Sequence, residues 1–203
     1  MLTLYPKTEA KDNSMNNSLN IGVFTSASSK LNEHYFALAK ALGSSLAKAG
    51  HTIIYGGAQI GMMGALANAA LENNGRVIGV FPENLGGREI AHPNLTEQIF
   101  TKGLHERKQV IYQKSDFFIS LPGGFGTLDE TFEVLTWNQL GHIQKPLYFF
   151  NANHFYDHLI QFIAHLEKDN FIKVYDSVGI NTFNDMSQLP IVLNKELKRK
   201  YAV

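Results

Sequence analysis

A glycine-rich segment in the middle of the chain has residue types suited to holding a phosphate. It reads Pro122-Gly123-Gly124-Phe125-Gly126-Thr127-Leu128-Asp129-Glu130 and follows an apolar run at 117–121. Consecutive backbone N–H groups can form an anion-binding nest, and Thr127 can cap the next helix or donate its hydroxyl to a phosphate. The alternative is a plain turn before a well-capped helix, with Asp129 and Glu130 matching the helix dipole. No Walker pattern is present, which disfavours ATP or GTP hydrolysis of that type.

Two carboxylates follow this loop at a helical spacing. Glu130 and Glu133 are three residues apart, so a helix would carry both on one face that begins beside the loop. A carboxylate in that position can stabilise a developing positive charge or activate a water molecule. A solvated surface is the other interpretation. It is sufficient for Glu133, whereas the closeness of Glu130 to the loop favours a function.

A charged cluster, His105-Glu106-Arg107-Lys108, lies near the start of another predicted helix. Arg107 could hold a phosphate or the hydroxyls of a sugar with its planar guanidinium group. Runs of charged residues are also typical of solvated helix faces. The residues alone leave both interpretations open.

A second glycine loop connects a predicted strand to a predicted helix at 55–64. Its glycines include Gly56, Gly57 and Gly61. Such glycines allow a tight turn and close approach of backbone to a phosphate at a helix N-terminus. The dinucleotide fingerprint G-x-G-x-x-G is interrupted, because Ala58 takes the place of its middle glycine. A simple strand-to-helix turn therefore explains this loop as well as a ligand site does.

Metal and thiol chemistry have little support in the sequence. The chain contains no cysteine, which excludes thiolate nucleophiles, disulfides and cysteine-ligated metals. His154 and His158 are four residues apart, but the H-E-x-x-H motif is absent and no carboxylate completes a ligand set. We expect no metal and no cofactor.

The elements that would position these groups alternate in type along the chain. Short apolar strands are predicted at 21–24, 52–55, 77–81, 117–121 and 147–150, with a further short segment around 97–100. Helices are predicted at 35–49, 62–71, 104–113, 127–140, 155–166 and after Asp185. This order predicts an α/β fold of the Rossmann-like, doubly wound type, a mostly parallel sheet with helices on both faces. Ligands bind beyond the carboxyl ends of such strands, where both glycine loops fall.

Length and charge restrict the remaining possibilities. The chain has 203 residues, 18 Lys and Arg against 18 Asp and Glu, and hence a formal net charge of zero. We predict a flexible tail at 1–18 and a single nucleotide-binding catalytic domain at 19–203. The neutral balance disfavours nucleic acid as a partner, and no apolar run approaches the ~18 residues of a membrane span. The first residues have no apolar signal-peptide core, so we expect a cytoplasmic protein.

Four motifs resemble those of one known family, in the right order and spacing. The segment 122–130 is similar to the P-G-G-x-G-T-x-x-E signature of the LOG (Lonely Guy) family, and 104–108 to its M-H-x-R-K motif. The segment 55–64 resembles its Y-G-G-G-x-x-G-L-M-G loop, and 136–141 its T-W-x-Q-L-G. The resemblance extends from about Ile21 to Ile172. Leu104 and Ala58 depart from the motifs, as does the turn Thr25-Ser26-Ala27-Ser28-Ser29, which replaces a C-G-S-S type.

The resemblance implies a cytokinin riboside 5'-monophosphate phosphoribohydrolase, which cleaves a purine nucleoside 5'-monophosphate, AMP included, to free base and ribose 5-phosphate. An older family label, possible lysine decarboxylase, finds no pyridoxal-phosphate signature here. By position, the family's catalytic pair corresponds to Arg107 and Glu130. Members of the LOG family are typically dimeric, so the resemblance implies that this protein forms a homodimer. The substrate and phosphate contacts that we expect are Gly56, Gly57, Gly61, Lys108, Gly123, Gly124, Gly126, Thr127 and Glu133.

Two other functions compete with this hydrolase. The first is a non-catalytic carrier of a nucleotide or of the molybdenum cofactor on the same fold, although a pure binder has no need of a carboxylate beside an anion site. The second is an NAD(P) oxidoreductase. The interrupted fingerprint weakens it, and Glu83 is the only nearby acidic candidate for a ribose partner.

Overall fold

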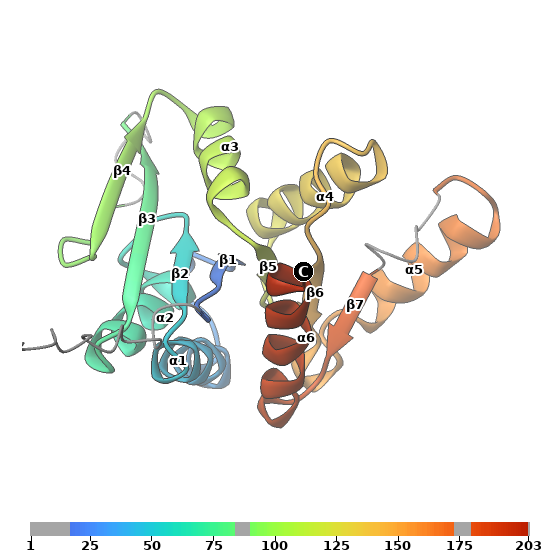
Figure 1. Ribbon diagram of the computed structural model, residues 1–203. Helices are drawn as coiled ribbons and strands as arrows, with labels where there is room; N and C mark the ends of the chain where they lie inside the picture. Colours follow the sequence, from blue (N-terminus) through green and yellow to red (C-terminus); the bar gives the residue numbers. More distant parts are fainter. Residues whose placement is uncertain (1–16, 84–89, 173–179, 203) are drawn as a thin grey trace, which may run out of the picture.

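The computed structural model describes residues 17–83, 90–172 and 180–202. Within them the chain forms one seven-stranded sheet in the order β4-β3-β2-β1-β5-β6-β7, and every neighbouring pair is parallel (Figure 1). The strands are β1 (Asn20–Phe24), β2 (Thr52–Tyr55), β3 (Arg76–Pro82), β4 (Glu97–Thr101), β5 (Phe117–Ser120), β6 (Leu147–Phe150) and β7 (Ile180–Phe183).

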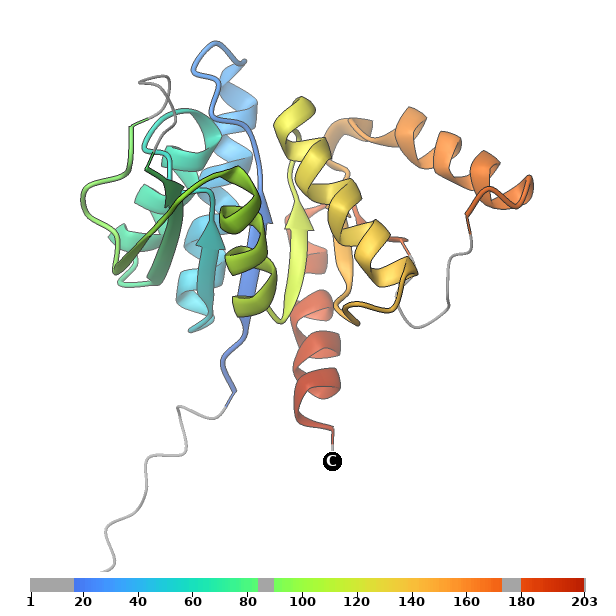
Figure 2. The same cartoon turned by 90° about the horizontal axis from the view of Figure 1, so that it is seen from above.

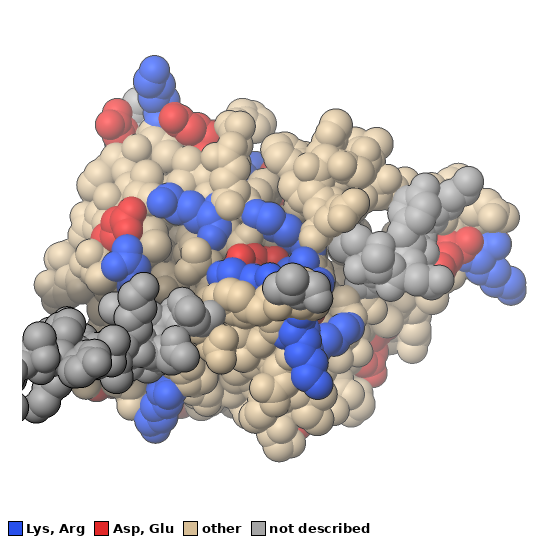
Figure 3. Space-filling model, viewed as in Figure 1, with Lys and Arg blue, Asp and Glu red and all other residues tan. Residues whose placement is uncertain are grey.

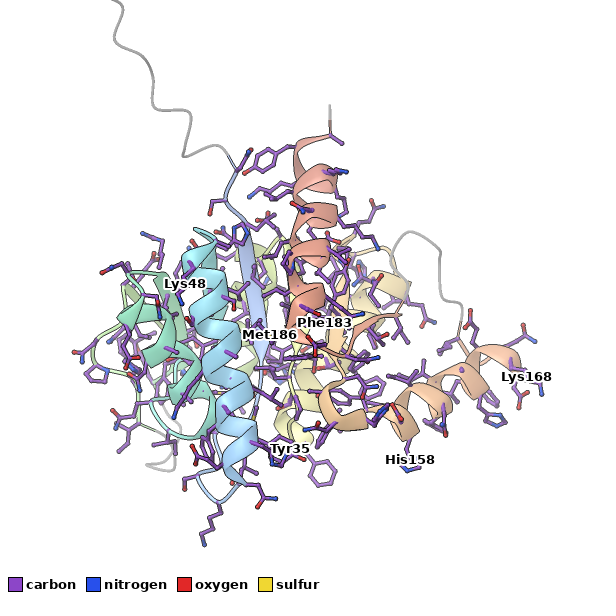
Figure 4. All side chains as sticks on the ribbon, turned by 90° about the horizontal axis from the view of Figure 1, so that it is seen from below. Tyr35, Lys48, His158, Lys168, Phe183 and Met186 are labelled. Carbon is purple, nitrogen blue, oxygen red and sulfur yellow. The ribbon has the colours of Figure 1, made fainter. Side chains whose placement is uncertain are left out.

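The α-helices of the described residues cover the sheet in two layers (Figures 1 and 2). Figure 4 shows α1 and α6 side by side on one face, where they pack with α2 in one apolar cluster. The other face carries a second cluster, to which α3, α4 and α5 contribute. The helices are α1 (Glu33–Lys48), α2 (Gly61–Glu72), α3 (Leu104–Lys114), α4 (Phe125–Gln139), α5 (Asp157–Lys168) and α6 (Leu189–Tyr201).

The sheet reverses its winding at β1. Strand β1 pairs with β2 on one side and with β5 on the other. The chain leaves β1 toward β2 and leaves β5 toward β6, so the two connections run to opposite sides of the sheet. A crevice therefore opens beyond the carboxyl ends of β1 and β5, where ligands of doubly wound folds bind. The strands that flank the crevice are buried except at Asn20, the first residue of β1, since helices cover both of their faces.

The fold class predicted from the sequence is confirmed, and two boundaries need comment. Strand β7 was not predicted, because its residues Ile-Asn-Thr-Phe mix polar and apolar types and it lies at the sheet edge with only Phe183 buried. The predicted tail falls almost wholly outside the described residues, which begin at 17. None of the described helices has the length and apolar character to cross a membrane.

A buried carboxylate holds α6 against the sheet. The side chain of Glu196 is fully buried and accepts hydrogen bonds from the Tyr148 hydroxyl (2.7 Å) and from Arg199 Nε (2.6 Å). Arg199 also donates to the Asp116 carbonyl oxygen at 2.7 Å. Lys200 forms an ion pair with the Asp116 carboxylate. On the face of the molecule seen in Figure 3, basic side chains gather around acidic ones. The C-terminal helix is thus fixed to the amino-terminal edge of the sheet, away from the crevice.

Replacing Arg199 by Ala should lower the free energy of unfolding by about 2 kcal/mol, because it leaves the Glu196 charge buried with a single hydrogen-bond donor. The full penalty of breaking a buried pair is reduced here, since 37% of the Arg199 side chain is exposed. Lys198→Ala, on the exposed side of the same helical turn, is the matched control. Urea unfolding of both variants checks this, and equal stability of the two would contradict the role given to Glu196.

Candidate active site

A polar cavity of about 280 Å³ lies at the crevice beyond β1 and β5. The loop after β1 forms one wall, and the first turns of α3 and α4 form the others. It is therefore at the edge of the sheet that the strand order predicts. The residues that line the cavity are Thr25, Ser26, Ala27, Ser28, Met63, Arg107, Gly124, Gly126, Thr127 and Glu130.

A buried ion pair forms the floor of this cavity. Arg107 from α3 and Glu130 from α4 are joined by Nη2 and Oε1 at 2.7 Å, with 11% and 3% of their side chains exposed. Burial raises the pKa of the Glu130 carboxyl, while the Arg107 guanidinium acts to lower it. The structure thus brings together the two residues predicted as a catalytic pair, although they are 23 positions apart in the chain.

Arg107 has hydrogen-bonding capacity left over. Its Nε atom is buried and has no hydrogen-bond partner among the described residues. A buried donor without a partner is unfavourable by about 1–3 kcal/mol, so such groups in native proteins usually meet a ligand or water. Arg107 also lines the cavity, so its guanidinium group borders the volume that a polar ligand could occupy.

The N-terminus of α4 opens into the same cavity. Gly124 is its N-cap residue, and no side chain caps the helix. The first backbone N–H groups of a helix have no partner within the helix, and they carry the positive end of its dipole. Side chains added at Gly124 or Gly126 would meet no atom within 4 Å, which shows that the loop borders open space. Thr127 is buried and lines the cavity with them.

Gly123 has a different role from its two neighbours. A Cβ atom at this position would collide with the side chain of Thr127. The glycine therefore lets the loop fold tightly over the first turn of α4. It also lies in the pocket next to the cavity rather than in the cavity itself.

The first glycine loop, at 55–64, packs against other segments of the protein. The Met63 N–H, in the first turn of α2, donates to the Ser26 carbonyl oxygen at 3.2 Å. Gly61 has φ +65°, and a Cβ there would collide with the backbone of Ala27. Gly57 accepts a hydrogen bond from the His92 N–H at 2.9 Å, so it faces another part of the chain. Neither Gly57 nor Gly61 lines the cavity.

Gly56 contributes to the site indirectly. A Cβ atom at this position would lie 3.2 Å from Met63 Cε and 3.4 Å from Arg107 Nη1, so this glycine borders the guanidinium group at the end of β2. The nearby Ala58, which interrupts the fingerprint, is fully buried and pairs with Ala91. The replacement of glycine at 58 thus lies away from the cavity.

Lys108 and Glu133 form a second charged layer behind the ion pair. Lys108 Nζ lies 2.6 Å from Glu133 Oε2 and 3.1 Å from Asp129 Oδ2, and the Tyr112 hydroxyl donates to Glu133 at 2.8 Å. Burial acts to lower the pKa of Lys108, but the hydrogen bonds that it donates to Glu133 and Asp129 raise the pKa above its usual value. Lys108 is therefore a paired cation that fixes α3 to α4, and neither it nor Glu133 lines the cavity.

Buried hydroxyl groups anchor α4 to the end of β5. The Ser120 hydroxyl lies 2.9 Å from that of Thr131 and 3.1 Å from that of Tyr156. Thr131 donates to the Thr127 carbonyl oxygen, and Tyr156 donates to that of Leu121. The two connected segments are the glycine loop and the helix that carries Glu130, so this network fixes their relative positions.

The hydroxyl-rich turn after β1 is the part of the cavity that was not among the predicted site residues. Thr25, Ser26 and Ser28 line it, and the Ser28 N–H donates to the Ser26 hydroxyl at 3.1 Å. The sequence feature that could have found these residues is their position directly after the central strand, where the strand order reverses. Among the described residues, no cluster of histidine and carboxylate side chains has the arrangement of a metal site.

The sequence matches known proteins over most of its length. The family model described as "Possible lysine decarboxylase" matches residues 63–191, more than half of the chain. The chain belongs to this family. It is 42% identical over 153 residues to the cytokinin riboside 5'-monophosphate phosphoribohydrolase of Rhodococcoides fascians, covering 75% of this chain and 77% of that protein. Its identity with LOG5 of Arabidopsis thaliana, of the same activity by name, is 40% over 74% of this chain and 66% of that one. These relatives confirm the predicted LOG family and enzyme class.

Solved structures of lower sequence identity share the fold. The molybdenum cofactor carrier protein of Chlamydomonas reinhardtii has a TM-score of 0.68 at 20% identity, over 89% of this chain and 98% of that one. The DNA processing protein A of Helicobacter pylori has a TM-score of 0.54 at 16% identity, over 93% and 85% of the two chains. At these identities the likeness concerns the fold alone.

The two glycine loops should respond differently to added side chains. Gly61→Ala should lower the free energy of unfolding by about 1–3 kcal/mol, because alanine is strained at positive φ and meets the Ala27 backbone. Gly126→Ala, in the first turn of α4 beside open space, should leave stability within about 0.5 kcal/mol of the parent protein. Thermal unfolding of both proteins measures this. If Gly61→Ala and Gly126→Ala destabilised the protein equally, the first loop would not be packed more tightly than the second.

Proposed function

We propose that this protein hydrolyses the N-glycosidic bond of a purine nucleoside 5'-monophosphate, AMP or a cytokinin riboside 5'-monophosphate, to free base and ribose 5-phosphate. The observation that carries the proposal is the buried Arg107–Glu130 pair facing a cavity that also receives the open N-terminus of α4. The names of the curated relatives support the same reaction. A cytoplasmic location remains a prediction from the sequence.

Glu130 is the group that we assign to the bond-breaking step. As the bond between C1' and the base nitrogen breaks, its electron pair leaves with the base and positive charge develops on the sugar. A carboxylate held in a buried site stabilises that charge strongly, as in glycoside hydrolysis. Water then forms the new bond to C1', and one of its protons passes by way of Glu130 to the departing base. No donor among the described residues reaches Oε2, which leaves this oxygen for the reaction.

The remaining groups of the cavity bind and orient the substrate. We assign the 5'-phosphate to the amides at the start of α4 and to Thr127, since helix N-termini favour anions. We assign the guanidinium group of Arg107, which lines the cavity, to a ribose hydroxyl. Its Nη2 holds Glu130 in place and favours the ionised carboxylate. Binding energy from the phosphate thus serves to place C1' above Glu130.

The competing functions fit this geometry less well. A carrier of a nucleotide or of the molybdenum cofactor gains nothing from a desolvated carboxylate beside an anion site, because the charge would repel its ligand. An NAD(P) oxidoreductase would place the pyrophosphate at the first glycine loop. There Ser26 already accepts the Met63 N–H, so the protein itself takes up one of the amides of that helix end.

We also propose a homodimer, supported by apolar side chains on the outer face of α4. Phe125 is 93% exposed, Leu140 62% and Phe132 37%. Their spacing of seven and eight residues puts them on the same side of the helix. Exposed apolar groups of this size along one helix are typical of an interaction surface. Trp137 of the same helix packs inward against Tyr112, at 5.5 Å between ring centroids.

Glu130→Gln should reduce kcat for AMP hydrolysis by at least about a thousandfold, because the amide cannot stabilise the cationic sugar or take the proton. AMP binding should persist within a few fold, since the phosphate contacts remain. Release of adenine is followed by chromatography, and binding by calorimetry. Glu72→Gln, at the far end of α2, controls for loss of a surface carboxylate. Near-normal turnover of Glu130→Gln would overturn the assignment.

The acid limb of the kcat/KM profile should lie above pH 4.3, the usual pKa of glutamate. Burial raises the pKa of Glu130, so its proton is lost at a higher pH than usual, and only the ionised form can act. Activity should therefore increase as the pH rises through that value and decrease below it. Rates measured from pH 4 to 8 test this. A rate that stays constant down to pH 4 would show that ionised Glu130 is not required.

A further inference from the structure

A second pocket, of about 310 Å³, adjoins the catalytic cavity at the start of α4. The two share Ser26, Ser28 and Gly124, so they meet at the end of the cavity to which the 5'-phosphate is assigned. Beyond this junction the described residues that line the second pocket are uncharged, and most are rich in carbon. They are Leu31, Tyr35, Met62, Pro122, Gly123 and Phe155.

We propose that this second pocket receives an aromatic group esterified to the 5'-phosphate, so that the protein also binds nucleoside 5'-phosphodiesters. The inference rests on the proposed function, which places the phosphate at the start of α4 and C1' over Glu130. A monophosphate ends at the phosphate and leaves the second pocket to water. A diester continues through the junction, and its second substituent is the part of the ligand that the apolar pocket can hold.

The junction between the two pockets offers donors for the oxygens of a phosphodiester. The Ser26 hydroxyl accepts a hydrogen bond from the Ser28 N–H at 3.1 Å, and the Ser28 hydroxyl accepts one from the Lys30 N–H at 3.3 Å. A serine hydroxyl can donate its own proton while it accepts. In the described part of the chain neither hydroxyl donates to a protein acceptor, so both O–H groups can turn toward a phosphate.

The charge of the cavity suits a ligand with a single negative charge. Among the described residues that line it, Arg107 and Glu130 are the charged ones, and they pair with each other at 2.7 Å. The uncompensated charge is then the positive end of the α4 dipole, equivalent to about half an elementary charge. A phosphate monoester carries about 1.5 to 2 negative charges at neutral pH, whereas a diester carries one. Esterification therefore reduces the repulsion by Glu130.

Two aromatic side chains form one wall of the second pocket. Tyr35 lies in the first turn of α1, on the side of the helix toward the start of α5 (Figure 4). Phe155 lies just before α5, and the two ring centroids are 5.9 Å apart at an interplanar angle of 81°. The rings thus meet edge to face, so a ligand ring packs beside the pair and not between its members. Phe155 remains 40% exposed, which leaves ring surface for this contact.

The turn that carries Phe155 is fixed by hydrogen bonds. Asn151, directly after β6, donates from Nδ2 to Asp157 Oδ1 at 2.7 Å and accepts the Tyr156 N–H at 2.7 Å. The Tyr156 hydroxyl donates to the carbonyl oxygen of Leu121, at the start of the second glycine loop, at 2.6 Å. The position of the Phe155 ring relative to that loop is therefore set before a ligand binds, which lowers the entropic cost of binding.

The test compares the phenyl and methyl esters of AMP at the 5'-phosphate. Both have the same charge, so the ratio of their dissociation constants isolates the ring. The phenyl ester should bind roughly tenfold more tightly than the methyl ester, because its ring packs in the apolar pocket. Phe155→Ala and Tyr35→Ala should each reduce this ratio to about threefold or less and leave the dissociation constant of AMP within about twofold. Phe162→Ala, an exposed phenylalanine on α5 outside the pocket, is the matched control.

Calorimetry of the full chain gives these constants, with Glu130→Gln in every protein so that the ligands are not consumed. Equal affinity for the two esters, a ratio that survives both alanine substitutions, or binding of AMP without binding of either ester would overturn the proposal. If AMP binds but the parent protein forms no adenine, the proposed reaction fails while the ester ratio still tests the pocket. If none of the three ligands binds, the phosphate site and the pocket are both wrong. Circular dichroism confirms folding, and Tyr35→Ala, on another helix, decides if Phe155→Ala does not fold.

Discussion

The arrangement of the site depends on a buried ion pair between Arg107 and Glu130. Arg107 and Glu130 come from two helices on the same face of the sheet, and their side chains are almost completely buried. A buried ion pair is costly unless its geometry is well supported. The support comes from the layer behind it, where Lys108 connects α3 to Glu133 and Asp129 on α4, and from the hydroxyl network that joins α4 to β5. The pair is therefore a property of the whole α3–α4 face.

The two glycine-rich loops look alike in sequence but have different physical tasks. At the start of α2, a carbonyl oxygen of the loop after β1 takes up a helix N–H group, and Gly61 allows the two loops to touch. At the start of α4, the loop borders empty space and no side chain caps the helix. The first glycine loop thus packs against the turn after β1, which lines the cavity, and the second borders the cavity itself. The positive end of the α4 dipole and the guanidinium group of Arg107 then both act on a ligand in the cavity.

Much of this arrangement could be predicted from sequence, and the failures have physical causes. Alternating apolar runs and helix-period segments determine a doubly wound sheet, so the fold and the edge that carries the site follow directly. Motif resemblance identified Arg107 and Glu130. Spacing could not reveal that Lys108 and Glu133 neutralise each other, because that pairing depends on how two helices cross. Nor could it show which glycine loop is closed, since the closing group comes from residue 26.

The most direct test of the account is to identify the products that the purified protein forms from AMP. Chromatography with standards separates adenine, adenosine, ribose 5-phosphate and inorganic phosphate. If the buried pair acts at C1' as proposed, AMP gives adenine and ribose 5-phosphate in equal amounts, with no adenosine. Adenosine with free phosphate would place the chemistry at the phosphate group and contradict the role of Glu130. Intact AMP after prolonged incubation, despite tight binding, would identify the cavity as a binding site without hydrolysis.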